Sequence, residues 1–154
     1  MSSLYFASSE PKTPRPSPAS GSDTSVRLRG QRVALVVEDD EAMGTAIADA
    51  LDDRGWNVVV VDTLAAARDT IARSHPALLV LDLTLKDEFG ATLLDELAGR
   101  DDAPATVIVS GFGLAPLVAA RFEVELVNKP FAVDAFIDAV ERANRDGKKP
   151  RATD

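Results

Sequence analysis

The sequence predicts an α/β domain built on a doubly wound, five-stranded parallel sheet. Short apolar runs rich in β-branched residues recur five times, and their length and composition indicate strands buried within a sheet. Longer segments with apolar residues at helical spacing separate these runs. A regular alternation of strands and helices favours a parallel sheet with helices on both faces, and we expect the strand order 2-1-3-4-5.

The N-terminal half of this alternation holds three strands and two helices. In order, we expect a strand at 33–37, a helix at 40–54, a strand at 58–61, a helix at 63–73 and a strand at 77–81. Gly55 stops the first helix. Thr63 can cap the second helix through its hydroxyl, and Pro76 lies just beyond its end. The second strand, like the first, is an uninterrupted valine-rich run, which predicts burial on both faces.

The C-terminal half repeats the same units. In order, we expect a loop leading to a helix at 90–98, a strand at 106–109, a short helix ending near 121, a strand at 124–127 and a helix at 133–144. Two glycines and a proline between 111 and 116 make the short helix weak. Phe136, Ile137 and Val140 give the last helix an apolar face.

Composition divides the 154 residues into three parts. Residues 1–30 hold four of the nine prolines among many serines, so we expect a disordered leader. Residues 31–145 form the one expected domain, and 146–154 are expected to be a flexible tail. The chain lacks the ~18-residue apolar run that a membrane helix needs, and its N-terminus lacks a signal-peptide core. We therefore expect a cytoplasmic protein with no membrane partner.

Charge and residue counts exclude several classes of function. The chain has 17 basic and 25 acidic residues, a net charge of −8, which argues against nucleic acid as a partner. The absence of cysteine excludes disulfides, thiolate metal sites and cysteine nucleophiles. A single histidine, His75, excludes multi-histidine metal sites within the chain and disfavours a Ser-His-Asp hydrolase.

Polar side chains follow four of the five expected strands. Glu38 and Asp39 follow the first strand, Asp82 the third, Ser110 the fourth, and Lys129 comes just after the fifth. With the order 2-1-3-4-5, the crevice that binds ligands lies at the carboxyl ends of the first and third strands. The three carboxylates should therefore face one another, with the hydroxyl and the ammonium group beside them.

This set of groups suits one kind of chemistry. Converging carboxylates repel one another, and a hard cation such as Mg²⁺ relieves that repulsion. A carboxylate can also act as a nucleophile and accept a phosphoryl group. The charge that develops during such a transfer needs a metal ion, a cation and a hydroxyl donor, which the strand ends supply.

Four segments, in this order and spacing, resemble the response-regulator receiver domain: VALVVEDDEAM, LLVLDLTLKDEFG, VIVSG and LVNKPF. Each motif is weak alone, but the ordered set over about residues 31–145 is specific. The resemblance implies a flavodoxin-like receiver fold. It also implies a stand-alone, single-domain response regulator in a two-component or phosphorelay system. Such a protein is a signalling phosphoacceptor rather than an enzyme, although self-catalysed phosphorylation and slow autodephosphorylation are expected.

The resemblance assigns a role to each acidic residue. Asp82 is implied as the phosphoacceptor. Glu38 and Asp39, together with Asp82, are implied as Mg²⁺ ligands, with Asp39 the most direct and Glu38 acting partly through water. The backbone carbonyl of Thr84 is implied as a further metal ligand.

The remaining residues are implied to act on the phosphoryl group or to shape the loops. Lys129 pairs with the phosphoryl oxygens, and Ser110 donates its hydroxyl to them. Pro130 fixes the loop after Lys129, through a cis bond. Gly90 supplies the turn into the following helix. The phosphodonor is a histidine kinase or a histidine phosphotransfer protein, and the downstream protein partner is not identified by the sequence.

Some residues allow plainer interpretations. Glu38, Asp39 and Asp40 could form a capping cluster at a helix N-terminus, and of the three Asp40 suits a cap best. Ser110 could simply begin a turn, and Lys129 could be a surface lysine.

Two departures from the family leave an alternative function open. Leu126 stands where the family usually has an aromatic switch residue, and the stretch 110–129 is about three residues shorter than is common. A phosphorylation-independent binding module on the same scaffold, a pseudo-receiver, is therefore the alternative. A hydrolase of the haloacid-dehalogenase type is a third class, but it usually has a second aspartate where this chain has Thr84.

Overall fold

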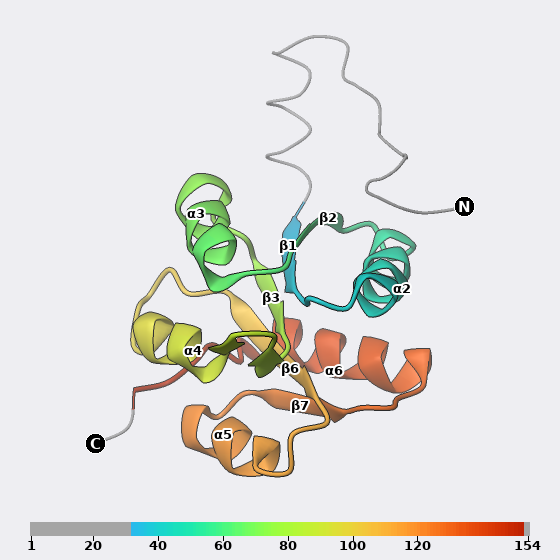
Figure 1. Ribbon diagram of the computed structural model, residues 1–154. Helices are drawn as coiled ribbons and strands as arrows, with labels where there is room; N and C mark the ends of the chain where they lie inside the picture. The colour runs from blue at the N-terminus through green and yellow to red at the C-terminus, as the bar shows by residue number, and fades with distance from the viewer. Residues whose placement is uncertain (1–31, 153–154) are drawn as a thin grey trace, which may run out of the picture.

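A computed structural model describes residues 32–152, which form one five-stranded parallel sheet flanked by helices (Figure 1). The strands are β1 (Val33–Val37), β2 (Asn57–Val61), β3 (Leu78–Leu81), β6 (Ala105–Ser110) and β7 (Glu125–Asn128), with a separate two-stranded sheet of β4 (Thr84–Leu85) and β5 (Glu88–Phe89). The helices are α2 (Glu41–Asp52), α3 (Leu64–Ser74), α4 (Ala91–Leu97), α5 (Ala115–Phe122) and α6 (Val133–Asp146).

The order of the main sheet is β2-β1-β3-β6-β7, and every pair in it is parallel. Because β4 and β5 pair only with each other, this is the predicted order 2-1-3-4-5 of the five predicted strands. The predicted doubly wound fold is therefore confirmed. Its order reverses between β1 and β3, so the carboxyl ends of these two strands border the crevice.

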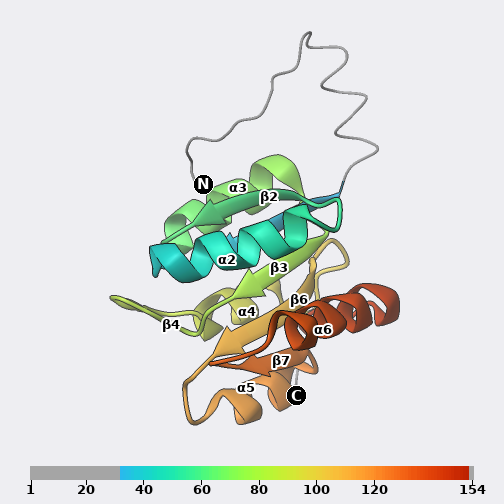
Figure 2. The same cartoon turned by 90° about the vertical axis from the view of Figure 1, so that its right-hand side faces the viewer.

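Alternate residues of each central strand pack into two apolar layers. Leu35 and Val37 of β1 contribute to the layer beneath α3, α4 and α5, whereas Ala34 and Val36 contribute to the layer beneath α2 and α6. Figures 1 and 2 show these two groups of helices on opposite faces of the sheet. Burial of Ala34–Val37 in β1 and of all four residues of β3 holds the carboxyl ends of both strands in fixed positions.

Two helix starts agree with the capping residues read from the sequence. The Asp40 carboxylate accepts a hydrogen bond from the backbone N–H of Met43 (2.9 Å) at the start of α2. The Thr63 hydroxyl accepts one from the N–H of Ala66 (3.1 Å) at the start of α3. Each cap satisfies a backbone donor that the helix itself leaves unpaired.

The β2 strand is less buried than its apolar sequence predicts. It lies at the edge of the sheet, and its residues are mostly half-buried, with Val60 42% exposed. An uninterrupted run of valines has the same appearance in an edge strand as in a central one. The prediction that this strand is buried on both faces is therefore wrong.

The sequence predicts only a loop where the structure has the β4–β5 hairpin. Its strands have two residues each, with Thr84 opposite Phe89 and Leu85 opposite Glu88. The Glu88 carboxylate also accepts a hydrogen bond from the N–H of Leu64 (2.9 Å), which ties the hairpin to the start of α3. Strands this short have no detectable apolar period, so the sequence does not reveal them.

The segment after α6 lies against the amino-terminal end of the sheet. The Lys148 carbonyl accepts a hydrogen bond from the N–H of Thr106 in β6 (2.9 Å), and the Arg151 N–H donates to the Phe122 carbonyl (2.9 Å). Pro150, between them, is buried. The structure differs here from the expected flexible tail, because main-chain hydrogen bonds fix a segment whose polar sequence carries no periodic signal.

The predicted leader, residues 1–30, lies outside the described residues. Within residues 32–152, none of the helices combines the length and the apolar character needed to cross a lipid bilayer.

Candidate functional site

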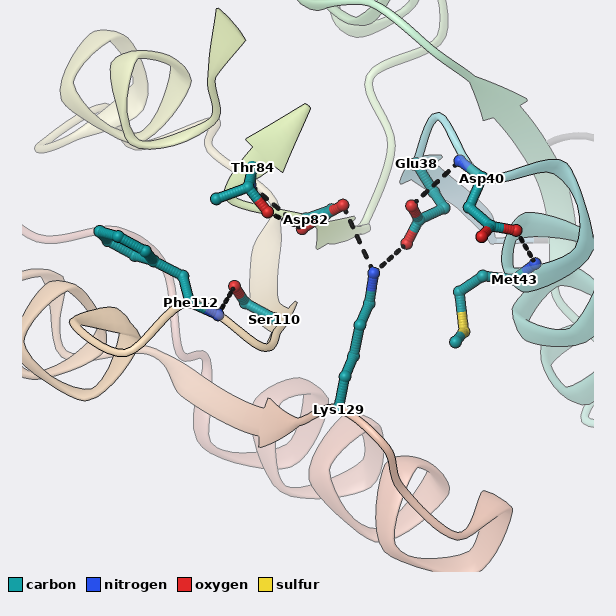
Figure 3. Close-up of polar contacts among 8 residues, drawn as sticks. All are labelled: Glu38, Asp40, Met43, Asp82, Thr84, Ser110, Phe112 and Lys129. Carbon is teal, nitrogen blue, oxygen red and sulfur yellow. Dashed lines mark hydrogen bonds and ion pairs between the residues drawn. The ribbon is translucent and has the colours of Figure 1, made fainter. Parts of the chain in front are cut away.

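Two buried acidic residues meet where β1 and β3 end. Val37 pairs with Leu81 in the sheet, and the N–H of Asp82 donates to the Val37 carbonyl (3.0 Å). Glu38 and Asp82 therefore leave adjacent strands at the same level, and both are only 4% exposed. Figure 3 shows their side chains pointing toward one another, with the Lys129 side chain between them.

The Glu38 carboxylate is bonded through both oxygens. Its Oε1 accepts from Lys129 Nζ (2.8 Å), and its Oε2 accepts from the backbone N–H of Asp40 (3.2 Å). Burial raises the pKa of Glu38 from 4.5 to about 7, because the bond from Lys129 only partly offsets desolvation and the neighbouring Asp82 charge raises the pKa further. In the metal-free protein, Glu38 therefore titrates near neutral pH.

The Asp82 carboxylate has partners on both sides. Its Oδ1 accepts from the backbone N–H of Thr84 (3.1 Å), with the Thr84 hydroxyl at 3.5 Å. Its Oδ2 lies 3.4 Å from Lys129 Nζ. The bond to Thr84 couples Asp82 to the first residue of β4 and orients the carboxylate across the crevice.

Lys129 follows β7 and reaches back across two strands to the acidic pair. The backbone N–H of Lys129 donates to the Ser110 carbonyl (3.0 Å), which fixes the main chain at the point from which the side chain extends. Burial alone lowers the pKa of Lys129, but the Glu38 hydrogen bond and the charges of Glu38 and Asp82 outweigh it, so the pKa is raised. Its ammonium group therefore stays charged at neutral pH. The following Lys129–Pro130 bond is cis, as the resemblance implies.

The acidic residues have the chemistry of a magnesium site. Glu38, Asp39 and Asp82 each offer a carboxylate oxygen, and these oxygens lie within 4.8 Å of one another. Asp39 is exposed whereas the other two are buried, so an ion would enter from the solvent side past Asp39. Hard oxygen ligands with room for retained water are what Mg²⁺ prefers. The donor set therefore fits the ion.

Ser110 ends β6 and is fully buried. Its hydroxyl oxygen accepts a hydrogen bond from the backbone N–H of Phe112 (3.0 Å; Figure 3). Among residues 32–152 this is the hydroxyl's one hydrogen bond, and none joins it to Asp82 or Lys129. Phe112 had no role in the sequence interpretation, although a serine that bonds the N–H two residues later is a recognisable turn signal.

Position 90 requires glycine because the site is closely packed there, not because of the backbone conformation. Its φ is −60°, which any residue can adopt, so the turn does not require glycine. A Cβ at this position would lie 2.5 Å from the Asp82 carbonyl oxygen and 3.0 Å from the Leu83 Cα. The absence of a side chain lets the start of α4 pack directly on the backbone of the site.

We expect Gly90→Ala to lower the free energy of unfolding by about 2–3 kcal/mol, because the backbone must shift to admit the methyl group. Urea unfolding measures the change. Gly113→Ala is the matched control, since a Cβ there meets no atom within 4 Å. Equal stability of the two variants would contradict the close packing described here.

Comparison with curated proteins finds response regulators. The chain is 33% identical over 94 residues to the photosynthetic apparatus regulatory protein RegA of Rhodobacter capsulatus, covering 60% of this chain and 51% of that protein. It is 30% identical over 115 residues to the transcriptional regulatory protein KdpE of Mycobacterium tuberculosis (strain H37Rv), covering 73% and 51%. The chain thus spans about half the length of these relatives.

Solved structures show the same fold. The signal receiver domain of a response regulator from Bermanella marisrubri is 29% identical, with a TM-score of 0.66, over 73% of this chain and 98% of that one. NtrX from Brucella abortus is 28% identical, with a TM-score of 0.69, over 77% of this chain and 28% of that one. The response regulator receiver domain family matches residues 34–141. The chain therefore belongs to the family of response regulator receiver domains.

Proposed function

We propose that this receiver domain accepts a phosphoryl group on Asp82, with Mg²⁺, and passes a signal on through protein–protein contacts. The observation that carries the proposal is the arrangement of Asp82. It is a buried carboxylate bonded to a lysine ammonium and grouped with two further carboxylates. A carboxylate held beside a cation and a metal-binding cluster is the arrangement that phosphoryl transfer to aspartate requires.

The residues of the site have separate roles in the transfer. Asp39 and Glu38, with Asp82 and the Thr84 carbonyl, are the proposed ligands of the ion. When bound, Mg²⁺ supplies the positive charge that draws the donor's phosphoryl oxygens to the carboxylates. Lys129 is already bonded to Glu38 and Asp82, and its ammonium stabilises the oxygens of the arriving phosphoryl group.

The chemical step is a displacement at phosphorus. A carboxylate oxygen of Asp82 forms a bond to the phosphorus atom as the bond between phosphorus and the donor's imidazole nitrogen breaks. The electron pair of that bond stays on the imidazole, and the product is an aspartyl phosphate. The burial of Asp82 keeps bulk water from the reacting atoms and slows the later hydrolysis.

The proposed partners are proteins. The phosphodonor is a histidine kinase or a histidine phosphotransfer protein, and a further protein reads the phosphorylated state. The net charge of −8 supports the view that the receiver does not itself bind nucleic acid. We also propose a cytoplasmic location, where such kinases present their phosphohistidine.

Mass spectrometry of the intact protein tests the proposal. With a small phosphodonor such as acetyl phosphate and Mg²⁺, we expect a mass increase of one phosphoryl group that chelation of Mg²⁺ prevents. Asp82→Asn should abolish the increase. Asp87→Asn, the same change on an exposed residue of the β4–β5 turn, should leave it intact.

Two outcomes would contradict the proposal. One is a lack of phosphoryl uptake by the unsubstituted protein, and the other is uptake that survives Asp82→Asn. The first would favour the pseudo-receiver, a binding module that works without phosphorylation. Leu126 in place of the family's aromatic residue is the observation behind that alternative. It predicts partner binding that Asp82→Asn does not alter.

A further inference from the structure

The coupling of the phosphorylation site to the protein surface needs a mobile group, and Leu126 is poorly suited to that task. Leu126 is only partly buried, but it packs against the apolar layer beneath α3, α4 and α5. An aliphatic side chain packed against the core has no polar atom whose hydrogen bond phosphorylation could change. A coupling device in this chain must therefore lie elsewhere.

A pair of phenylalanines lies next to the site. Phe112, half-buried in the loop between β6 and α5, meets Phe89 of β5 edge to face. The ring centroids are 5.4 Å apart and the ring planes are inclined by 77°. Phe89 is 43% exposed, so this member of the pair is accessible to a partner protein.

Each phenylalanine is joined to one side of the phosphoacceptor. Phe89 pairs with Thr84 across the hairpin, and the Thr84 N–H is bonded to Asp82. Phe112 donates its N–H to the hydroxyl of Ser110, the residue proposed to contact the phosphoryl group. The contacts therefore form a continuous path from Asp82 through the hairpin and the two aromatic rings to Ser110.

We infer that Ser110, Phe112 and Phe89 form the switch that couples phosphoryl occupancy of Asp82 to the surface of the β4–β5 hairpin. The inference rests on the proposed function of Asp82. In the structure, the Phe112 N–H donates to the Ser110 hydroxyl oxygen. When Ser110 rotates about its Cα–Cβ bond to bring the hydroxyl to a phosphoryl oxygen, the hydroxyl oxygen moves away from that N–H. The N–H then lacks an acceptor, which favours a movement of the backbone.

The glycines of this loop permit that movement. Gly111 and Gly113 flank Phe112, and a Cβ at Gly113 would meet no atom within 4 Å. A shift of the loop carries the Phe112 ring away from Phe89. The hairpin then presents Phe89 without its aromatic partner, which is a change that a protein partner can detect. Phe112 is thus a positioning residue that acts through Ser110.

Nuclear magnetic resonance of the full chain with Mg²⁺ and beryllofluoride, a mimic of the phosphoryl group, tests the switch. The fluorine signal of bound beryllofluoride reports occupancy of Asp82. The nuclear Overhauser effect between the ring protons of Phe89 and Phe112 reports the aromatic contact. The ring signals are assigned by comparison with the Phe89→Leu and Phe112→Leu variants. We expect occupancy to abolish this contact. Bound beryllofluoride with the contact unchanged would overturn the inference alone, whereas no binding would overturn the proposed function, and the inference with it.

Binding affinity gives an independent measurement. Because the aromatic contact stabilises the position that Phe112 has in the structure, Phe112→Leu should tighten beryllofluoride binding about 2- to 10-fold. Phe112→Tyr keeps the contact and should bind as the unsubstituted protein does. In a Ser110→Ala background, Phe112→Leu should not change the affinity for beryllofluoride, since the hydrogen bond between Ser110 and Phe112 is already absent.

Leu126→Val is the control and should leave both the affinity and the ring contact unchanged. A purely structural role for Phe112 predicts weaker binding in Phe112→Leu, accompanied by lower thermal stability. That result, or an equal effect of Phe112→Leu with and without Ser110, would overturn the inference.

Discussion

Lys129→Met is expected to slow phosphoryl uptake by about 100-fold and to lower the free energy of unfolding by about 2–4 kcal/mol at pH 8. The lysine ammonium bridges two buried carboxylates, at 2.8 Å from Glu38 and 3.4 Å from Asp82. Methionine fills a similar volume but supplies no charge. The two carboxylates then face each other in a largely buried site, which destabilises the fold and repels an incoming phosphoryl group.

Two measurements separate these effects. Urea unfolding with and without Mg²⁺ should show that the ion restores part of the lost stability, because a bound cation replaces the missing positive charge. The rate of the phosphoryl mass increase should remain low even where the protein is folded. Lys86→Met removes an exposed lysine of the hairpin and is expected to change neither quantity. A Lys129→Met protein with the original rate and stability would contradict the role of the ammonium.

The sequence predicts the sheet and the set of strand-end residues because both depend on strong, local patterns. The uninterrupted apolar runs of β1 and β3 define two buried strands. The polar residues that follow these runs therefore lie at the carboxyl ends of the strands. Glu38, Asp82 and Lys129 are accordingly found in contact. Their roles in phosphoryl transfer remain predictions that the proposed variants test.

Features that depend on tertiary packing could not be predicted. The contact of Phe89 in β5 with Phe112 in the loop after β6 joins two segments with no shared sequence pattern. The sequence predicts that Gly90 supplies a turn, whereas its backbone conformation is one that any residue can adopt, and glycine is needed because the Asp82 carbonyl lies so close. Both depend on how closely two separate segments approach, which no local sequence pattern specifies.

The metal-free protein is expected to lose stability as the pH rises from about 4.5 to about 7, because of Glu38. Its pKa is 4.5 in the unfolded chain and about 7 in the folded protein, mainly through burial. Between these values the folded state holds a proton that the unfolded state has released. A rise in pH therefore favours unfolding, by a total of about 3 kcal/mol from this group. Above pH 7 both states are ionised and its contribution is constant.

Mg²⁺ is expected to reverse that trend, because the ion and the proton compete for Glu38. The stabilisation that Mg²⁺ confers should be small at pH 5 and should grow as the pH rises through about 7, where Glu38 ionises. Thermal unfolding in chelator and in Mg²⁺, across this pH range, measures both slopes. Glu38→Gln should flatten the metal-free slope, whereas Glu41→Gln, on the exposed start of α2, should retain it. A slope that survives Glu38→Gln would assign the titration to another group and would remove Glu38 from the competition between proton and metal.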